Sequence, residues 1–237
     1  MTISIITLFP DVFKPLLKSS ILAKAQEEKK LKVNLINLRN FGIGPHKQVD
    51  DRPYGGGVGM ILRIDVLAEA IKKAKGSPKA GKRQAKTILL TPQGKVFNQK
   101  TAQRLAKAKH LILICGHYEG VDERVRKLVD EEISIGDYIL SGGEVPAMVV
   151  LDAITRLLPG VLNKEATSKE SFSPYTLNAK RYTLLEPPQY TRPEEFEGMV
   201  VPRVLLSGNH QKIKDWRLKE AFKKTKRRRS DLLIVDG

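Results

Sequence analysis

The sequence has 237 residues, 41% of them hydrophobic and 29% charged, so it can bury a full core and is not an intrinsically disordered chain. Lys and Arg number 42 against 26 Asp and Glu, and the formal net charge of +16 favours a polyanionic partner such as nucleic acid. The single cysteine, Cys115, excludes an internal disulfide and suits a reducing compartment. Because it lies in the apolar run HLILIC, we expect a buried small side chain rather than a nucleophile.

The N-terminal stretch MTISIITLFPDVF has no basic residue ahead of its apolar part, which Pro10 and Asp11 interrupt, so it is not typical of a signal peptide. The longest apolar run, VPAMVVL, is far shorter than the roughly 20 residues of a transmembrane helix. We therefore expect a soluble, cytoplasmic protein that does not insert into a membrane.

Strand-like apolar runs alternate with helical patterns in the first part of the chain. Strands are expected at residues 3–8, 31–38, 87–90, 111–115 and 132–135. Asp65 and Asn98 stand where the N-caps of two intervening helices belong, and a third helix is expected over residues 146–158, starting at Pro146. This order predicts an α/β fold with a mostly parallel sheet covered on both faces.

Three glycine-containing loops follow neighbouring strands of this expected sheet. They are TPQG at 91–94, GHYEG at 116–120 and GDYILSGGE at 136–144. Ligands of parallel sheets bind outside the carboxyl ends of the strands, and glycine allows the backbone to approach a ligand closely. The pattern therefore predicts a ligand site at this edge.

The remainder of the chain has a different character. Residues 161–188 are polar and without periodicity, as in a linker or a mobile loop, and residues 210–233 have a helical period with Trp216 expected in a core. A basic cluster near the end is expected to face phosphates: Lys223, Lys224, Lys226, Arg227, Arg228 and Arg229. We thus expect a ligand-binding domain at 1–160, a flexible linker at 161–188 and a small helical RNA-binding domain at 189–237.

Common nucleotide and metal motifs are absent from the sequence. No P-loop and no dinucleotide G-x-G-x-x-G occurs, the four histidines have no ligand spacing, and G-x-S-x-G is missing. We expect no protein-bound metal centre. The run YGGGVGM at 54–60 follows a charged loop rather than a strand, so it is as compatible with a hinge as with a phosphate cradle.

Eight strings in chain order resemble one family: VDDRPYGGGVGM, LTPQGKVF, CGHYEGVDERV, SIGDYILSGGEVPA, RLLPGVL, YTRPEEFEGM, VPRVLLSGNH and WRLKEA. They are similar to the bacterial tRNA (guanine-N1)-methyltransferases of the knotted SPOUT class, and the resemblance spans nearly the whole chain. It implies S-adenosylmethionine-dependent methylation of N1 of the guanosine at tRNA position 37. It further implies a homodimer with active sites between the subunits and a deep trefoil knot around the cofactor loops. Mg²⁺ is a further candidate cofactor.

The resemblance also implies the residues of the cofactor site. They are Leu90, Thr91, Pro92, Gly94, Gly116, Ile135, Gly136, Asp137, Tyr138, Ile139, Leu140, Gly142, Gly143 and Pro146. The apolar residues at 135 and 138–140 can wall an adenine, and the glycines let the main chain come close. A structural turn that starts a helix at Pro146 explains this segment equally well when it is considered alone.

Two residues match the family's catalytic positions. Glu170, in KESF, occupies the place of an aspartate that removes the N1 proton, and Arg156, in TRLLPGVL, matches an arginine that stabilises negative charge on O6. Glutamate has similar basicity but one more methylene, so the role is expected to survive with altered reach. His117 stands where the family commonly has arginine.

RNA contacts are implied for Asp50, Arg52, Tyr54 and Gly55, in a loop able to close over a flipped base, and for Glu186 as a second linker acid. Compared with the family, the chain has extra residues between Phe172 and Gln189. Two alternatives stay open: a non-catalytic RNA-binding protein on this scaffold, and a knotted methyltransferase with another RNA target.

Overall fold

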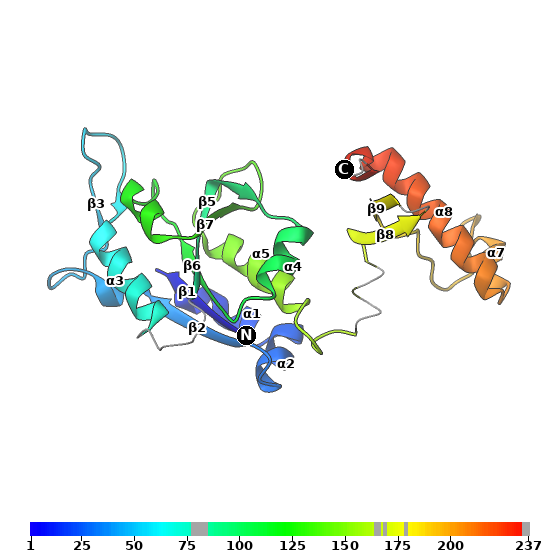
Figure 1. Ribbon diagram of the computed structural model, residues 1–237, viewed down its shortest axis with the longest axis horizontal. Helices are drawn as coiled ribbons and strands as arrows, with labels where there is room; N and C mark the ends of the chain where they lie inside the picture. The colour runs from blue at the N-terminus through cyan, green and yellow to red at the C-terminus, as the bar shows by residue number, and fades with distance from the viewer. Residues whose placement is uncertain (77–84, 164–166, 168–169, 178–179, 234–237) are drawn as a thin grey trace. The chain divides into compact units, whose positions relative to one another are not determined.

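A computed structural model describes residues 1–76, 85–163, 167, 170–177 and 180–233. The chain divides into two compact units, Met1–Leu162 and Asn163–Gly237 (Figure 1). The first boundary falls two residues beyond the expected end of the ligand-binding domain.

The first unit is built on a five-stranded parallel sheet of order β2-β1-β6-β5-β7. Its strands are β1 (Thr2–Thr7), β2 (Lys32–Asn37), β5 (Lys86–Val96), β6 (His110–Cys115) and β7 (Glu131–Ser134). Every pairing within it is parallel, so the predicted sheet is confirmed. Two short strands, β3 (Asp50–Asp51) and β4 (Ile61–Leu62), pair antiparallel beside it.

Alternating side chains of the central strands enter two separate cores. Leu111, Leu113 and Cys115 of β6 belong to one buried cluster, whereas Ile112 and Ile114 belong to the other. Because successive residues of a strand point to opposite faces, a continuously apolar strand is the mark of a sheet buried on both sides. The expectation from the sequence is therefore confirmed.

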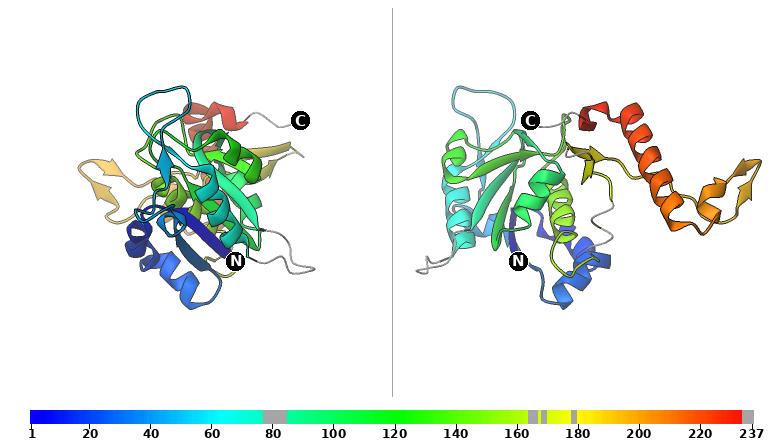
Figure 2. Two further views of the ribbon diagram at one scale, coloured as in Figure 1. Left: turned by 90° about the vertical axis from the view of Figure 1, so that its left-hand side faces the viewer. Right: turned by 45° about the vertical axis from the view of Figure 1, so that its right-hand side comes forward.

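Helices cover both faces (Figures 1 and 2). The first core includes residues of η1 (Pro10–Phe13), α2 (Ser20–Glu27), α4 (Gln99–Leu105) and α5 (Glu144–Thr155), with α1 (Lys14–Leu17) packed beside it. The second includes residues of η2 (Leu38–Phe41), α3 (Ile64–Lys75) and η3 (Glu123–Leu128). Asn98 caps α4 as predicted, since its side chain accepts a hydrogen bond from the Thr101 N–H at 2.9 Å.

Three predicted boundaries in this unit were wrong. The strand predicted at 87–90 extends to Val96, so the TPQG loop lies inside β5. Helix α3 starts at Ile64, and Asp65 is inside it, where its carboxylate accepts from the Val66 N–H and pairs with Arg63. Helix α5 runs from Glu144 to Thr155, so Pro146 is its third residue. A proline costs nothing there because the first four N–H groups of a helix have no partner within it.

The second unit contains two antiparallel hairpins and one long helix (Figure 2). Its elements are β8 (Ser173–Leu177), β9 (Lys180–Leu184), β10 (Glu195–Phe196), β11 (Met199–Val200), α7 (Arg203–Leu206), α8 (His210–Arg228) and η4 (Ser230–Leu233). The β8–β9 hairpin lies in the range where the sequence predicts a flexible linker, and it pairs Tyr175 with Tyr182. Aromatic residues favour strands, a signal that the polar composition of the segment obscured.

Two further expectations for this unit need correction. The helix predicted to reach residue 233 ends at Arg228, and a 3-10 turn follows. Trp216 is half-buried rather than fully enclosed, with its ring 6.4 Å from that of Tyr190. Within the described ranges of both units, no helix has the length and apolar character needed to cross a bilayer.

Candidate functional site

The three predicted loops lie at one edge of the sheet. Strands β6, β5 and β7 are immediate neighbours and parallel, so the segments that follow their apolar parts emerge on the same side. This adjacency was only an expectation from the sequence, and the sheet order bears it out.

The first segment, residues 91–94, is a bulge within β5. Leu90 and Lys95 both pair with Ile133 of β7, so the four residues between them have no partner on that strand. A Cβ added to Gly94 would lie 2.4 Å from the backbone nitrogen of Ile133, so glycine is required there by the return of the strand to its neighbour. The backbone at residues 91–93 therefore leaves the hydrogen-bonded ladder between β5 and β7.

The second and third segments are joined to each other through their backbones. The Gly143 N–H donates to the Gly116 carbonyl at 2.8 Å, and His117 forms an isolated antiparallel bridge with Gly142. A Cβ on Gly143 would lie 2.6 Å from the Cα of Cys115. Glycine is therefore required at position 143 because the second and third segments lie too close together there to leave room for a side chain.

Gly116 differs from these glycines because the described part of the protein does not require it. A Cβ built there would meet its nearest atom, the Leu90 carbonyl oxygen, at an ordinary 3.6 Å, and its φ is not positive. The same edge carries apolar side chains that are exposed: Tyr138, Ile139 and Leu140 at 53%, 81% and 39%. A glycine that the fold does not require, on the same edge as exposed apolar groups, fits a flat, largely apolar ligand held by main-chain groups.

The other residues of the predicted cofactor set lie on the same segments. Leu90 is buried at the end of the regular part of β5, Asp137 is exposed, and Pro146 is partly buried in the first turn of α5. Gly136 has a φ of 149°, and Ile135 packs on the first core. The Tyr138 hydroxyl donates to the Ile135 carbonyl at 3.3 Å, which closes the turn between them.

A buried carboxylate beneath the loops was not anticipated from the sequence. Glu144 is 8% exposed, and the Thr7 hydroxyl donates to its Oε1 at 2.6 Å. Its Oε2 lies 3.9 Å from Nδ1 of His117, beyond hydrogen-bonding distance. Burial, together with the neighbouring Glu144, raises the pKa of the Cys115 thiol well above its usual value, so this thiol stays protonated and inert.

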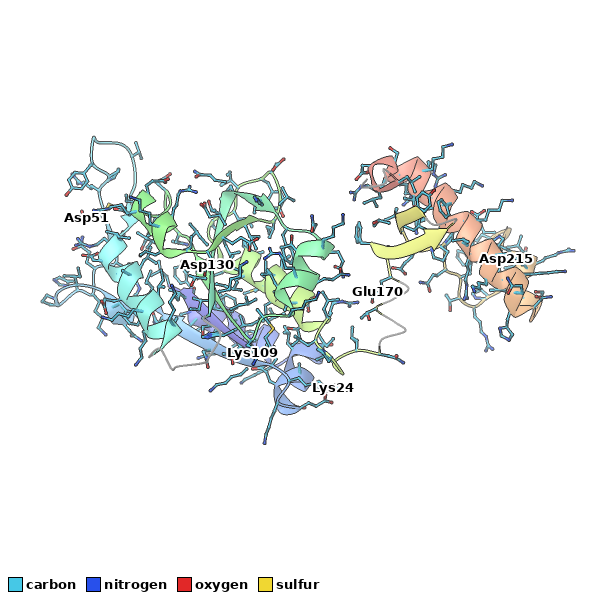
Figure 3. All side chains as sticks on the ribbon, in the orientation of Figure 1. Lys24, Asp51, Lys109, Asp130, Glu170 and Asp215 are labelled. Carbon is cyan, nitrogen blue, oxygen red and sulfur yellow. The ribbon has the colours of Figure 1, made fainter. Side chains whose placement is uncertain are left out.

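Arg156 belongs to the first unit and Glu170 to the second. Arg156 is partly buried at the C-cap of α5, where its N–H donates to the Asp152 carbonyl at 3.1 Å. Glu170 is partly buried and directly precedes Ser171; Figure 3 labels it ahead of β8.

The β8–β9 hairpin brings together in space the two segments that carry the acids predicted in the linker, Glu170 and Glu186. The Glu186 N–H donates to the Ser171 hydroxyl at 3.1 Å, and that hydroxyl lies 3.4 Å from the Glu186 carboxylate. Glu186 thus contacts the residue that follows Glu170. Nothing in the local sequence signals this contact, because its partners are 15 residues apart.

The loop predicted to contact RNA spans β3 and β4. Asp50 and Asp51 pair with Leu62 and Ile61, and the Arg63 guanidinium bonds Asp51 at 2.9 Å, which fixes the base of the loop. Arg52 is exposed. Tyr54, at the tip, is fully exposed, and Gly55 next to it has a φ of +84°. Asp51 is labelled in Figure 3.

Acidic, histidine and cysteine side chains do not gather into a possible metal site of three or more anywhere in the described ranges. What the first unit presents is a site made of backbone turns and apolar walls at the carboxyl edge of a parallel sheet. These features are typical of α/β proteins that bind small ligands at the carboxyl ends of parallel strands.

Comparison with known proteins identifies the family. Residues 1–234 match the family described as "tRNA (Guanine-1)-methyltransferase TrmD". The chain is 54% identical to a tRNA (guanine-N(1)-)-methyltransferase of Carboxydothermus hydrogenoformans, over 100% of this chain and 89% of that protein. Relatives of the same name from Geobacillus kaustophilus and Bacillus subtilis are 53% and 49% identical, over 98% of this chain and 91% and 92% of theirs. The chain belongs to this family of tRNA methyltransferases, which confirms the resemblance drawn from the eight sequence strings.

Proposed function

We propose that the protein is an S-adenosylmethionine-dependent enzyme that methylates N1 of the guanosine at position 37 of tRNA, next to the anticodon. The observation that carries the proposal is the match to one methyltransferase family over almost the entire chain. The convergence of three backbone segments at one sheet edge, with a glycine at 116 that the fold does not require, supports it independently.

S-adenosylmethionine supplies a methyl group activated by a sulfonium. Its adenine would lie against the apolar residues 138–140, and main-chain groups of 90–94, 116 and 135–140 would read its edge. Gly142 and Gly143 hold the second and third segments together through their backbones. We therefore assign them to shaping the site rather than to direct contact with the cofactor.

The chemical step needs a base because guanine N1 carries a proton. We assign Glu170 to remove that proton and Arg156 to stabilise the negative charge that collects on O6. Arginine suits this role because it does not lose its own proton. Glu186 would contact the guanine edge beside Glu170, in keeping with the contact between Glu186 and Ser171.

The remaining parts of the proposal concern RNA and assembly. The loop with Asp50, Arg52, Tyr54 and Gly55 would cover a flipped base, and the basic cluster of α8 would contact phosphates. By family resemblance we further propose a homodimer with sites between subunits, a trefoil knot around the cofactor segments, and a cytoplasmic location. Mg²⁺ is a second candidate cofactor, and loss of activity on adding EDTA would test it.

The decisive experiment is methyl transfer to unmodified tRNA carrying G or A at position 37. We expect transfer to G only, with mass mapping placing the methyl on N1. Glu170→Gln and Arg156→Ala should each lower the rate by about 10²-fold or more while binding of S-adenosylmethionine is kept.

Two outcomes would contradict this assignment. A protein that binds tRNA but gives no calorimetric signal with S-adenosylmethionine would be a non-catalytic RNA binder. A methyl found on ribose or another base, with both variants fully active, would indicate a methyltransferase with a different target, because a ribose hydroxyl has no N1 proton to remove.

A further inference from the structure

Residues 182–186 pack against the C-terminal half of α8. The ring of Tyr182 meets that of Phe222 edge-on, with centroids 5.3 Å apart, and Leu184 is only 7% exposed. The end of the β8–β9 hairpin is thereby attached to the longest helix of the second unit by apolar contacts.

Two side chains of α8 also bind the main chain immediately before and at Glu186. The Leu185 N–H donates to Oγ1 of Thr225 at 2.9 Å, and Lys224 Nζ donates to the Glu186 carbonyl at 2.9 Å. Thr225 is fully buried, and its own hydroxyl donates to the Ala221 carbonyl at 2.7 Å. Its orientation is therefore fixed by the helix, and its oxygen is directed at Leu185 as an acceptor.

The fixed Glu186 in turn holds the segment that carries Glu170. Its N–H bonds the Ser171 hydroxyl, and the Phe172 N–H donates to the Leu184 carbonyl at 2.9 Å. Gln189 Nε2 donates to the Glu186 carboxylate at 2.9 Å. A connected series of hydrogen bonds thus runs from Thr225 and Lys224 to the residues directly after Glu170.

We propose that Thr225 and Lys224 are positioning residues, through which α8 orients the Glu170 and Glu186 carboxylates before tRNA binds. This inference rests on the proposed function, in which Glu170 is the base. A segment ordered in advance loses little conformational freedom when the substrate arrives, and a base held in place reacts faster than one that must find its position. Tyr182 and Leu184 of the hairpin supply the apolar contacts that attach this segment to the helix.

The test compares Thr225→Val with Thr225→Ser. Valine keeps the shape of threonine but offers no acceptor to Leu185, whereas serine keeps the hydroxyl. For Thr225→Val we expect the single-turnover methylation rate at saturating tRNA to fall about 10-fold to 100-fold, since small misplacements of a reacting group have effects of this size. Thr225→Ser should restore the rate to near that of the wild type.

Three further measurements separate positioning from general damage. Binding of S-adenosylmethionine and the KM for tRNA should change little in Thr225→Val. Hydrogen exchange of the Leu185 and Glu186 amides, measured without tRNA, should accelerate. A variant that merely loosened the unit would lose tRNA affinity and would not be rescued by serine.

Lys224→Met provides a second, independent variant should Thr225→Val fail to fold. Its matched control is Lys219→Met, which removes the same charge from an exposed position of α8 outside the basic cluster. We expect Lys224→Met to lower the single-turnover rate at saturating tRNA while the KM for tRNA changes little, and Lys219→Met to leave both unchanged; a higher KM with an unchanged rate would assign Lys224 to phosphate binding instead.

The proposal is overturned if folded Thr225→Val, or Lys224→Met in its place, methylates at the wild-type rate while Glu170→Gln is inactive. If Glu170→Gln keeps full activity, the proposed catalytic role itself fails. The two failures are therefore distinguishable.

Discussion

Glycines in the candidate site are required for different reasons at different positions. At Gly143 the protein's own backbone occupies the space of a side chain, whereas at Gly116 the surrounding protein would tolerate one. A glycine that the fold does not need, in a segment of the candidate site, is suited to close approach by another molecule.

A pair of alanine substitutions tests this distinction. Gly143→Ala should lower the free energy of unfolding by about 1–3 kcal/mol, because its methyl would overlap the Cys115 backbone. Gly116→Ala should keep wild-type stability in urea denaturation but bind S-adenosylmethionine about tenfold or more weakly by calorimetry. Unchanged affinity in Gly116→Ala would remove the argument that the cofactor lies there.

Two buried threonines form another matched pair. The Thr7 hydroxyl donates to Glu144 and accepts from the Phe9 N–H at 2.9 Å, so Thr7→Val should cost about 1–3 kcal/mol of unfolding free energy. Thr87 is equally buried, and within the described residues its hydroxyl has no hydrogen-bond partner. Thr87→Val should therefore be neutral or stabilising in the same denaturation experiment, and a loss equal to that of Thr7→Val would contradict this reasoning.

At the scale of elements, Glu131 links β7 to two neighbours. Partial burial alone would raise its pKa, but a hydrogen bond from Arg104 of α4 and the ion pair with Lys86 of β5 outweigh it and hold the pKa of Glu131 below its usual value. Lys86 Nζ lies 2.9 Å from the carboxylate. This one side chain therefore ties a helix to the amino ends of two neighbouring strands, at the edge of the sheet opposite the candidate site.

The lowered pKa has a definite consequence for stability against acid. A carboxylate with a lower pKa in the folded state contributes stability above its unfolded pKa and loses that contribution as the pH falls through the folded value. Glu131→Gln should therefore be less stable than the wild type at pH 7, by about 1–2 kcal/mol. The difference should shrink below the ordinary glutamate pKa of 4.5. Urea denaturation across this range checks it, and a difference independent of pH would contradict the ion-pair explanation.

The sequence was most informative about elements with a strong local pattern. Unbroken apolar runs such as 111–115 predicted strands buried on both faces, and Asn98 predicted the start of α4. The bulge in β5 was missed because Pro92 and Gly94 are typical of a loop, while the pairing of Lys95 with Ile133 depends on a distant strand.

Contacts between distant residues explain what the sequence left out of the candidate site. Thr7 and Glu144 are 137 residues apart, and Leu185 and Thr225 are 40 apart, so no local pattern marks either pair. The predicted catalytic residues came from family resemblance, and their roles stay predictions.

At the scale of the whole molecule, the charge of +16 is the dominant property. Six of the basic residues stand within seven positions at the end of α8 and just beyond it, at 223–229. Such clusters release counterions from nucleic acid, so we expect tRNA affinity to fall steeply with salt concentration.

Neutralising Lys226, Arg227 and Arg228 to glutamine tests this expectation. The slope of log affinity against log salt should become shallower by up to about 0.9 for each phosphate that the variant no longer neutralises. Neutralising Lys72, Lys73 and Lys75 at the end of α3 removes the same charge from the other unit and serves as the control. Equal changes in both variants would indicate attraction by overall charge rather than direct binding of phosphates by α8.

The bulge of β5 has an implication for engineering. Leu90 and Lys95 both pair with Ile133 of β7, so the register shifts at the bulge and the ladder continues from Lys95 to Val96. Positions 91 and 92 could therefore be varied in a library without removing a ladder hydrogen bond to β7. Gln93, whose side chain accepts from Arg126, and Gly94, which is needed for the tight return beside Ile133, would be retained. Such a library would separate affinity for S-adenosylmethionine from stability of the sheet, because the proposed cofactor contacts of residues 91 and 92 lie outside the ladder.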